Sequence, residues 1–317
     1  MKIVMMGSGG VGGYFGARLA LAGADVTFVA RGAHLAAMRD KGLTLDTPQG
    51  LVHAPKIRVV EHARDAGVAN FVLLSVKLWD TEEVLQQIKP IVGPASAVIS
   101  LQNGVHKEEL LAQAFVPAQR MGGVAYVAAR VEAPGRIKQT GSMQRLQFGE
   151  YDGQRSARAQ ALLAACVKGG INAEIPDDIR RAIWEKYVFL AALSGATTSM
   201  RSTIGPIRSN PQTRAFFLDL MREVVAVARA SGVSLPADYA EQRLKLADDV
   251  DVGMTSSMHH DLEAGNRLEV RWLSGGVAEL GARLGVPTPL HRAVFDILVL
   301  HAQGAAGRGK SQARGLA

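Results

Sequence analysis

The sequence is poor in several features that would mark particular classes of protein. Its single cysteine, Cys166, cannot form a disulfide within the chain, so a reducing compartment is expected and Cys166 itself is predicted to be buried. Aromatic residues make up only 5%, and no uncharged apolar run approaches the roughly 20 residues of a membrane span. Basic residues form no run and do not alternate with aromatics. This pattern argues against a nucleic-acid-binding surface and against a membrane partner.

The overall composition is that of a folded enzyme. Hydrophobic residues make up 48% and charged residues 21% of 317 residues, a length that favours two domains. Part of the net charge of +7 comes from Arg308, Lys310 and Arg314 in a Gly-rich final stretch. An anionic cofactor and substrate account for the remaining excess. The first residues, MKIVMMGSGG, lack the length and cleavage site of a signal peptide, so a cytoplasmic location is expected.

The first half of the chain alternates short β-rich apolar runs with helical stretches. Strands are predicted over residues 2–6, 25–30, 71–76 and 98–101, and a helix over residues 10–22 with Gly23 as its C-terminal cap. This rhythm is typical of βαβ units. It predicts an α/β class protein whose N-terminal half is a Rossmann domain with a doubly wound parallel sheet.

The second half reads differently. A helix over 156–169 and a last strand over 170–175 precede Pro176-Asp177-Asp178, which is predicted to break the chain and cap a helix. Long helical patterns then cover residues 179–193, 213–231 and 256–284. We therefore expect a domain over 1–176, an all-α domain over 177–317, and a flexible tail from about 303.

A glycine-rich segment follows the first predicted strand and opens the first predicted helix. It reads Gly7-Ser8-Gly9-Gly10-Val11-Gly12, the GxGxxG pattern of dinucleotide-binding loops. Gly7 is expected to allow the tight turn, Gly9 to let the backbone approach a pyrophosphate, and Gly12 to allow close helix packing. The segment predicts a nicotinamide dinucleotide site.

The residue after the second strand predicts which dinucleotide is bound. NAD-binding units usually have an acid there, which accepts hydrogen bonds from the ribose 2′-hydroxyl. This chain has Arg31 instead. A guanidinium pairs with the 2′-phosphate that an acid would repel, so Arg31 favours NADPH; the alternative is a solvated surface arginine.

Two polar side chains follow further strands of the predicted sheet. Lys77 comes just after the strand over 71–76, and Asn103 follows the strand over 98–101 and precedes Gly104. Open α/β sheets bind ligands at the carboxyl ends of their strands, which favours a cofactor or substrate role for both. Ordinary loop residues are the alternative.

Five segments together resemble the ketopantoate reductase family, 2-dehydropantoate 2-reductase. They span almost the whole chain and read GSGGVGGYFGARLALAG, SVKLWDTEEV, LQNGV, IWEKYVFLAALSGATT and TSSMHHDLEAGNRLEV. The resemblance implies a Rossmann domain followed by a helical domain like that of 6-phosphogluconate dehydrogenase. It also implies NADPH-dependent reduction of a 2-oxo acid, with ketopantoate as the leading substrate and pantoate, a precursor of pantothenate, as product. It leaves the oligomeric state open, with a homodimer as one option, and implies no metal.

Carried over position by position, the resemblance assigns roles to individual residues. It makes Lys186 the catalytic lysine, Asn103 a contact of cofactor and substrate, Ala129 and Glu269 cofactor contacts, and Ser257 a substrate contact. The sequence supports Lys186 independently, because it lies in the apolar run 182–190. Partial burial there is expected to lower its ammonium pKa from about 10.4 and suit it to give a proton to a carbonyl oxygen. The alternative is a lysine that snorkels from an apolar helix.

The chain departs from the family where substrate is bound. The family usually has Asn four, eight and eighteen residues after the catalytic lysine, and this chain has Leu190, Ser194 and Ile204. Spacing places Leu190 and Ser194 on the helix face of Lys186, so Lys186, Leu190 and Ser194 are predicted to contact substrate. Loss of the amide donors leaves a second hypothesis open, the same chemistry on a more apolar 2-oxo acid. A non-catalytic NADP-binding regulator is the alternative from another class.

The segment after Ser257 is expected to continue one helix through Glu269. Twelve residues at about 100° each place the two side chains roughly 120° apart around that helix. They would therefore reach different parts of a broad cleft, with Glu269 near the nicotinamide ribose and Ser257 near the substrate. A helix-capping or solvated serine is the alternative for Ser257.

Overall fold

The structure is a computed structural model that describes residues 1–305. Its internal contacts divide the chain into two compact units, of which the first is Met1–Ile183 and the second begins at Trp184. The division falls inside one helix, α6 (Ile179–Met200). Most of the expected flexible tail lies outside the described residues. Among the described helices, none combines the length and apolar character needed to cross a membrane.

The centre of the first unit is a parallel sheet with the strand order β5-β2-β1-β6-β7-β8. This is the strand order of a dinucleotide-binding doubly wound sheet. Successive strands are added on one side of β1 up to β5 and then, from β6 onward, on its other side. The expected Rossmann architecture is therefore confirmed. The strands are β1 (Lys2–Met6), β2 (Asp25–Val29), β5 (Arg58–Val60), β6 (Ala69–Leu74), β7 (Val92–Ser100) and β8 (Arg120–Ala133).

The sheet continues beyond β8 in a way that the sequence did not predict. β8 forms a long antiparallel hairpin with β9 (Arg136–Gly149), and β9 pairs in parallel with β3 (Leu43–Thr47) and β10 (Asn172–Glu174). An antiparallel strand, β4 (Gly50–Ala54), forms the edge beside β3. The sheet is thus mixed, and the purely parallel expectation holds only for the six consecutive strands from β5 to β8.

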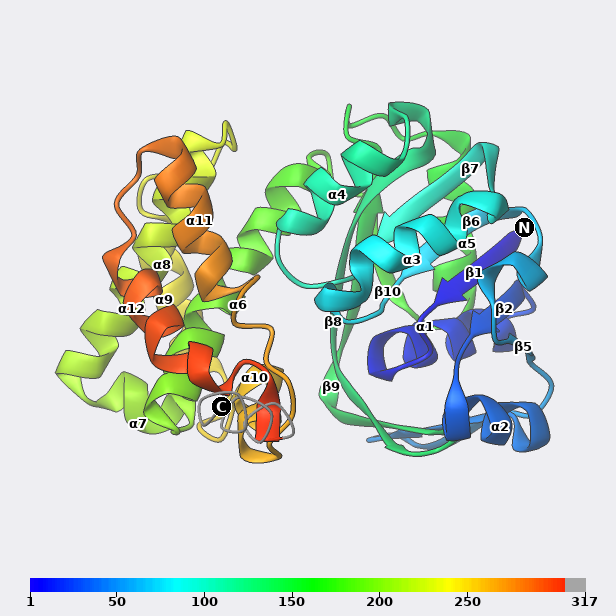
Figure 1. The fold of residues 1–317 in the computed structure, drawn as a ribbon, viewed down its shortest axis with the longest axis horizontal. Coiled ribbons are helices and arrows are strands. Elements are labelled where there is room, and N and C mark those ends of the chain that lie inside the picture. Colours follow the sequence, from blue (N-terminus) through cyan, green and yellow to red (C-terminus); the bar gives the residue numbers. More distant parts are fainter. Residues whose placement is uncertain (306–317) are drawn as a thin grey trace, which may run out of the picture. The chain divides into compact units, whose positions relative to one another are not determined.

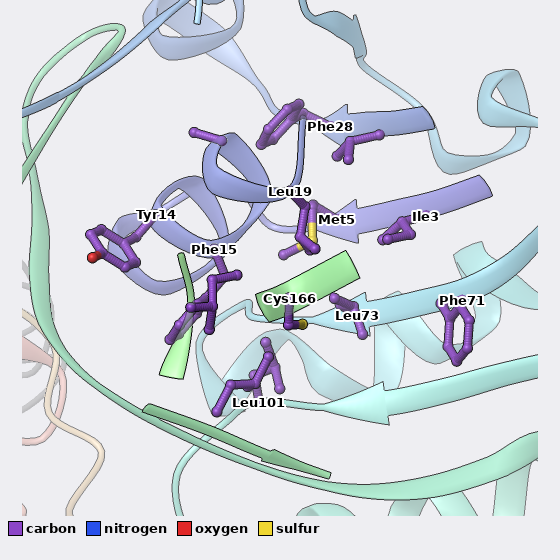
Figure 2. Close-up of a cluster of buried hydrophobic side chains, with 14 of the residues drawn as sticks. Ile3, Met5, Tyr14, Phe15, Leu19, Phe28, Phe71, Leu73, Leu101 and Cys166 are labelled. Atoms are coloured by element: carbon purple, nitrogen blue, oxygen red, sulfur yellow. The ribbon is translucent and has the colours of Figure 1, made fainter. Parts of the chain in front are cut away.

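Alternation along the strands separates two hydrophobic cores. Ile3 and Met5 face one core, whereas Val4 and Met6 face the other, because successive side chains of a strand point to opposite faces. Figure 2 shows the first core, with Phe15 and Leu19 of α1 near Cys166 of α5. The helices on that side are α1 (Gly10–Leu21), α2 (Gly32–Lys41) and α5 (Ala157–Lys168), and those on the other are α3 (Thr81–Ile88) and α4 (His106–Ala114).

Local signals explain where these helices begin and end. Gly23 has a φ of +88°, and the amide of Ala24 donates to Leu19, which closes the C-terminus of α1 as expected. The Ser156 hydroxyl caps α5, and the Asp178 carboxylate accepts from the Arg181 amide at the start of α6. The predicted break at 176–178 is therefore confirmed.

The second unit is helical throughout its described part, as expected (Figure 1). Its central helix is α8 (Pro211–Ala230), whose buried side chains include Phe217, Leu220 and Val224 and which packs against several other helices. The helices after α6 are α7 (Ile204–Ser209), α8 (Pro211–Ala230), α9 (Tyr239–Asp249), α10 (Ser257–Glu263), α11 (Ser274–Leu284) and α12 (Pro289–Leu298). A short 3-10 helix, Val299–His301, follows α12.

One predicted helix is wrong. The pattern over residues 256–284 is not a single helix, because α10 ends at Glu263 and α11 begins only at Ser274. Gly265 has a φ of +69°, which closes α10, and the Leu268 amide donates to the Ala302 carbonyl instead of to a preceding turn. Tertiary hydrogen bonding therefore overrides a sequence that is apolar at helical spacing.

Candidate active site

The glycine loop connects β1 to α1 with the geometry expected of its residues. Gly7 has a φ of +95°, which favours glycine. A Cβ on Gly12 would lie 2.0 Å from the Gly7 carbonyl oxygen, so α1 approaches the strand as closely as glycine allows. At Gly9 no atom of another described residue beyond its chain neighbours lies within 4 Å of a Cβ position. The backbone at Gly9 is therefore open to a ligand at the start of a helix.

The hairpin of β8 and β9 packs against the same loop. A Cβ on Gly10 would lie 2.0 Å from the carbonyl oxygen of Ala129, and one on Gly13 would meet Ile137. Ala129, which the resemblance assigns to the cofactor, thus lies beside the first turn of α1. The loop is also fastened to β2, because the Ser8 hydroxyl donates to the Val29 carbonyl at 2.9 Å.

His34 supports the glycine loop and was not expected from the sequence. Its Nδ1 accepts a hydrogen bond from the Gly135 amide at 3.1 Å, so Nε2 carries the proton and donates to the Ser8 carbonyl at 2.8 Å. Burial lowers the pKa of His34, and the bond to the Ser8 carbonyl opposes that shift. The neutral ring therefore joins the loop to the turn of the hairpin.

Arg31 lies two residues after the end of β2, at the N-cap of α2. Its side chain is 80% exposed, and its guanidinium lies 3.2 Å from the carboxylate of Asp80, in the turn that follows β6. Exposed ion pairs of this kind contribute little energy, so the guanidinium can exchange this partner for a stronger anion. Lys77 is exposed in the same turn, with its ammonium 5.5 Å from the centre of the Trp79 ring.

The Asn103 loop follows β7 and is tied to the Lys77 loop. The side-chain Nε2 of Gln102 donates to the Val76 carbonyl at 3.0 Å and to the Thr81 hydroxyl at 2.8 Å. Gly104 has a φ of +78°, which makes the tight bend that the Asn-Gly pair predicted. Asn103 is half-buried. One side chain, Gln102, therefore joins two of the loops at the carboxyl edge of the sheet.

Helix α6 carries the predicted catalytic lysine in the second unit. Lys186 and Leu190 are half-buried, and Ser194 is 1% exposed. The Ser194 hydroxyl has no hydrogen-bond partner among the described residues. Ile204, at the third changed position, is completely buried at the start of α7. The spacing argument holds to this extent: Lys186, Leu190 and Ser194 follow one another along a single continuous helix.

Glu269 lies in the irregular segment between α10 and α11 and not on a helix shared with Ser257. The calculated separation of 120° between these side chains is therefore wrong. Glu269 is 6% exposed, and its carbonyl accepts from the amides of Trp272 and Leu273. The Tyr187 hydroxyl lies 3.0 and 2.9 Å from the Trp272 and Leu273 carbonyls, and its single proton is shared between these two acceptors. The residue next to Lys186 therefore anchors the segment that carries Glu269.

Ser257 is the first residue of α10 and is exposed. The helix is capped by its neighbour Ser256, whose hydroxyl accepts from the His259 amide, so the capping alternative does not apply to Ser257 itself. The His259 ring joins α10 to α6, with Nδ1 2.8 Å from the Thr197 carbonyl.

The predicted site residues are divided between the two units. The glycine loop, Arg31, Lys77, Asn103 and Ala129 belong to the first, and Lys186, Leu190, Ser194, Ser257 and Glu269 belong to the second. The four side chains that sequence reasoning missed, His34, Gln102, Tyr187 and His259, bond mainly to backbone atoms. Such partners leave no pattern in a sequence. The described residues contain no group of His, Cys, Asp or Glu suited to hold a metal ion.

A nucleotide-binding fold with a lysine-bearing helical unit defines a class of two-unit oxidoreductases, and comparison with known proteins names the family. The model of the family "Ketopantoate reductase PanE/ApbA" matches residues 3–153, and that of its C-terminal domain matches residues 178–302. The chain therefore belongs to the ketopantoate reductase family and is an oxidoreductase.

Individual relatives agree with this assignment. The chain is 34% identical to the 2-dehydropantoate 2-reductase of Mesorhizobium japonicum over 319 residues, which covers 94% of this chain and 97% of the relative. It is 32% identical to the uncharacterized oxidoreductase YkpB of Bacillus subtilis, with 95% and 99% covered. The crystal structure of 2-dehydropantoate 2-reductase from Geobacter metallireducens has a TM-score of 0.85 and 27% identity, with 94% and 99% covered.

Proposed function

We propose that this chain reduces a 2-oxo acid to the corresponding 2-hydroxy acid with NADPH, and that 2-dehydropantoate is the leading substrate. The observation that carries the proposal is Lys186 on an apolar helix, in a chain whose other unit has an open glycine loop. Pantoate would then be the product, and a role in pantothenate biosynthesis in the cytoplasm is part of the proposal. The glycine loop after β1 and Arg31 after β2 support the cofactor part of the proposal.

The glycine loop fits the pyrophosphate of a dinucleotide. Gly9 leaves the backbone accessible, and the amides at the start of α1 point out of a helix N-terminus, which favours an anion. Arg31 stands where an NAD-binding unit has an acid, and its exposed guanidinium suits the 2′-phosphate of NADPH. When bound, the reduced nicotinamide supplies a hydride.

Lys186 is proposed as the general acid. As the hydride reaches the carbonyl carbon of a 2-oxo acid, the carbonyl oxygen gains negative charge. An ammonium group gives a proton to that oxygen and completes the 2-hydroxy acid. Asn103 and Glu269 are proposed to orient the cofactor, and Ser257 and Ser194 to hold the polar groups of the substrate. Helix α6 is rigidly placed within its own unit by Tyr187, which suits a group that must be positioned accurately.

A specific observation favours a second substrate class. Leu190 lies one turn from Lys186 and offers no donor for the 4-hydroxyl or the carboxylate of 2-dehydropantoate. A more apolar 2-oxo acid, such as 2-oxoisovalerate, would lose nothing at this position. The unpartnered hydroxyl of buried Ser194 favours 2-dehydropantoate, because a buried hydroxyl without a partner gains from a polar substrate.

A panel of 2-oxo acids tests the proposal in steady-state NADPH oxidation. We expect 2-dehydropantoate to give the highest kcat/KM. The substitution Leu190→Asn should raise the ratio of kcat/KM for 2-dehydropantoate over 2-oxoisovalerate, because it restores amide donors beside Lys186. Efficient wild-type turnover of 2-dehydropantoate that Leu190→Asn impairs would show that other groups hold the hydroxyl. Absence of NADPH oxidation with every 2-oxo acid would overturn the proposed function.

A further inference from the structure

Lys107 is a buried cation that the proposed function does not use. It lies in the first turn of α4, and its side chain is 2% exposed. Its ammonium donates to three backbone carbonyls: Ser100 at 2.9 Å, Gln102 at 2.8 Å and Gly123 at 2.8 Å. Three N–H donors thus meet three acceptors, which is the full capacity of a lysine ammonium.

These acceptors lie where two central strands separate. The register of β7 and β8 ends at the pairs Val98–Arg120 and Ile99–Met121, and the carbonyls of Ser100 and Gly123 come just after it. A Cβ on Gly123 would lie 2.9 Å from the Ser100 carbonyl oxygen, so the two backbones are still close there. The ammonium therefore continues the connection between β7 and β8 beyond the last ladder pair.

The third acceptor connects Lys107 to the predicted site. The Gln102 carbonyl belongs to the same planar peptide unit as the Asn103 amide, so holding that oxygen fixes the direction in which the chain enters Asn103. The side chain of Gln102 bonds to Val76 in the Lys77 loop and to Thr81 at the start of α3. The main chain and the side chain of Gln102 are thus both fixed, one by Lys107 and the other by the Lys77 loop.

The charge of Lys107 is partly balanced within the same helix turn. Burial lowers the pKa of Lys107, and the Glu108 carboxylate, 3.9 Å from the ammonium, opposes that shift. Glu108 accepts a hydrogen bond from the Tyr151 hydroxyl, and its pKa is raised by burial and lowered by Lys107, Arg120 and Arg180. A lysine near a helix N-terminus is unfavourable for the helix dipole, so the three hydrogen bonds of the ammonium have to offset both this effect and the burial of the charge.

We propose that Lys107 is a positioning residue, whose buried ammonium holds the Asn103 loop in the orientation that reduction of the 2-oxo acid requires. This inference rests on the proposed function, in which Asn103 contacts the cofactor and the substrate. Lys107 itself touches neither, because its donors are directed to three carbonyls of its own unit. Its effect on the reaction passes through the backbone that leads into Asn103.

A double-mutant cycle with Asn103 tests this directly. Lys107→Met keeps the length and bulk of the side chain but removes the three donors, and Asn103→Ala removes the group that is positioned. We expect Lys107→Met to lower kcat/KM for the 2-oxo acid at least tenfold in the wild-type background. In the Asn103→Ala background it should lower kcat/KM less than twofold, because the positioned group is already absent. Equal losses in both backgrounds would overturn the proposal.

Ser96→Ala is the matched control. Ser96 also fastens β7, since its buried hydroxyl donates to the Ala69 carbonyl and accepts from the Gly93 amide, but it does so far from the carboxyl edge of the sheet. We expect Ser96→Ala to lower the Tm without changing kcat/KM by more than about twofold. A loss of kcat/KM in Ser96→Ala that matches the loss in Lys107→Met would show that general loosening of β7 suffices, and would overturn the proposal.

Two further measurements keep the result interpretable. If Lys107→Met does not fold, Lys107→Gln, which retains two N–H donors on a shorter side chain, enters the same cycle. A smaller loss of kcat/KM is then expected in the wild-type background, and none in the Asn103→Ala background; equal losses in both overturn the proposal. If the wild type reduces no 2-oxo acid, the proposed function fails, and hydrogen–deuterium exchange of residues 99–106 then judges the loop alone. Faster exchange there in Lys107→Met than in Ser96→Ala supports positioning of the loop, and equal exchange overturns it.

Discussion

Arg31 is the residue on which the choice of cofactor depends. Its exposed guanidinium has only a weak partner in Asp80, so the 2′-phosphate of NADPH should displace that partner and form a charge-assisted bond. We expect the wild type to bind NADPH roughly tenfold or more tightly than NADH, and Arg31→Ala to remove most of that preference. Titration followed by nicotinamide fluorescence measures both affinities.

Arg64→Ala is the control for this prediction, because Arg64 is a similarly exposed arginine of the same unit, paired with Asp65. Its substitution should leave both affinities unchanged. Equal binding of NADPH and NADH by the wild type would contradict the role given to Arg31.

Lys186 is the residue on which the reaction itself depends. General acid catalysis typically contributes about 10² to 10⁴ in rate, so Lys186→Ala should lower kcat by that order while NADPH affinity changes little. Stopped-flow measurement of hydride transfer separates this step from product release. Lys245→Ala, which removes an exposed lysine of α9, should leave the rate unchanged. Near-normal hydride transfer in Lys186→Ala would mean that the proton comes from another group.

At the scale of elements, the sequence predicted best what depends on local patterns. The strands β1, β2 and β6 and the helices α1, α5 and α8 lie close to their expected ranges, because apolar periodicity and caps are written into contiguous residues. Of β7, which begins at Val92, only the end was predicted. The hairpin β8–β9 was missed. β9 mixes apolar residues with Arg, Lys, Gln and Gly, and its pairing with β3 and β10 joins segments that are distant in the sequence.

The candidate site follows the same rule. A glycine loop, an arginine after a strand and a lysine in an apolar helix are visible in the sequence. Lys107 and His34 are not, because their partners are backbone carbonyls and amides contributed by other elements. The segment around Glu269 was predicted as helix for a related reason, since its Leu268 amide bonds to Ala302, 34 residues away.

The junction of α1 with the hairpin gives a prediction at this scale. Gly10→Ala would place a Cβ 2.0 Å from the backbone of Ala129, so the hairpin must shift and the protein should lose roughly 1–3 kcal/mol of stability. Gly9→Ala meets no neighbour and should leave the Tm unchanged while it weakens NADPH binding, because its methyl group occupies the open face of the loop. Thermal unfolding and fluorescence titration distinguish the two. A Gly10→Ala protein as stable as the wild type would contradict this packing.

At the scale of the whole molecule, His291 connects stability to pH. It is completely buried in α12, with Nε2 3.0 Å from the Leu220 carbonyl of α8 and no partner for Nδ1 among the described residues. Burial lowers the pKa of His291 from 6.5 to about 4. The neutral ring is therefore favoured in the folded state, so its contribution is present above pH 6.5 and is lost as the pH falls towards about 4.

This shift corresponds to roughly 3 kcal/mol of unfolding free energy at the most. Urea denaturation between pH 7 and pH 4, followed by circular dichroism, should show a decline that His291→Gln reduces, because glutamine keeps a donor for Leu220 and does not titrate. A decline of the same size in His291→Gln would assign the acid sensitivity to other groups.

Cys166 is a natural probe for the opening of the first unit. It is the sole thiol of the chain, it is completely buried beneath α1, and burial raises its pKa to about 12. A maleimide dye can therefore reach it only after the Rossmann core opens, so the labelling rate measures the opening of that core. The helical unit contains no cysteine and does not react with the dye. Thiol labelling thus times the opening of the first unit in the intact protein, and comparison with the loss of helical circular dichroism, to which both units contribute, shows whether the second unit unfolds with it.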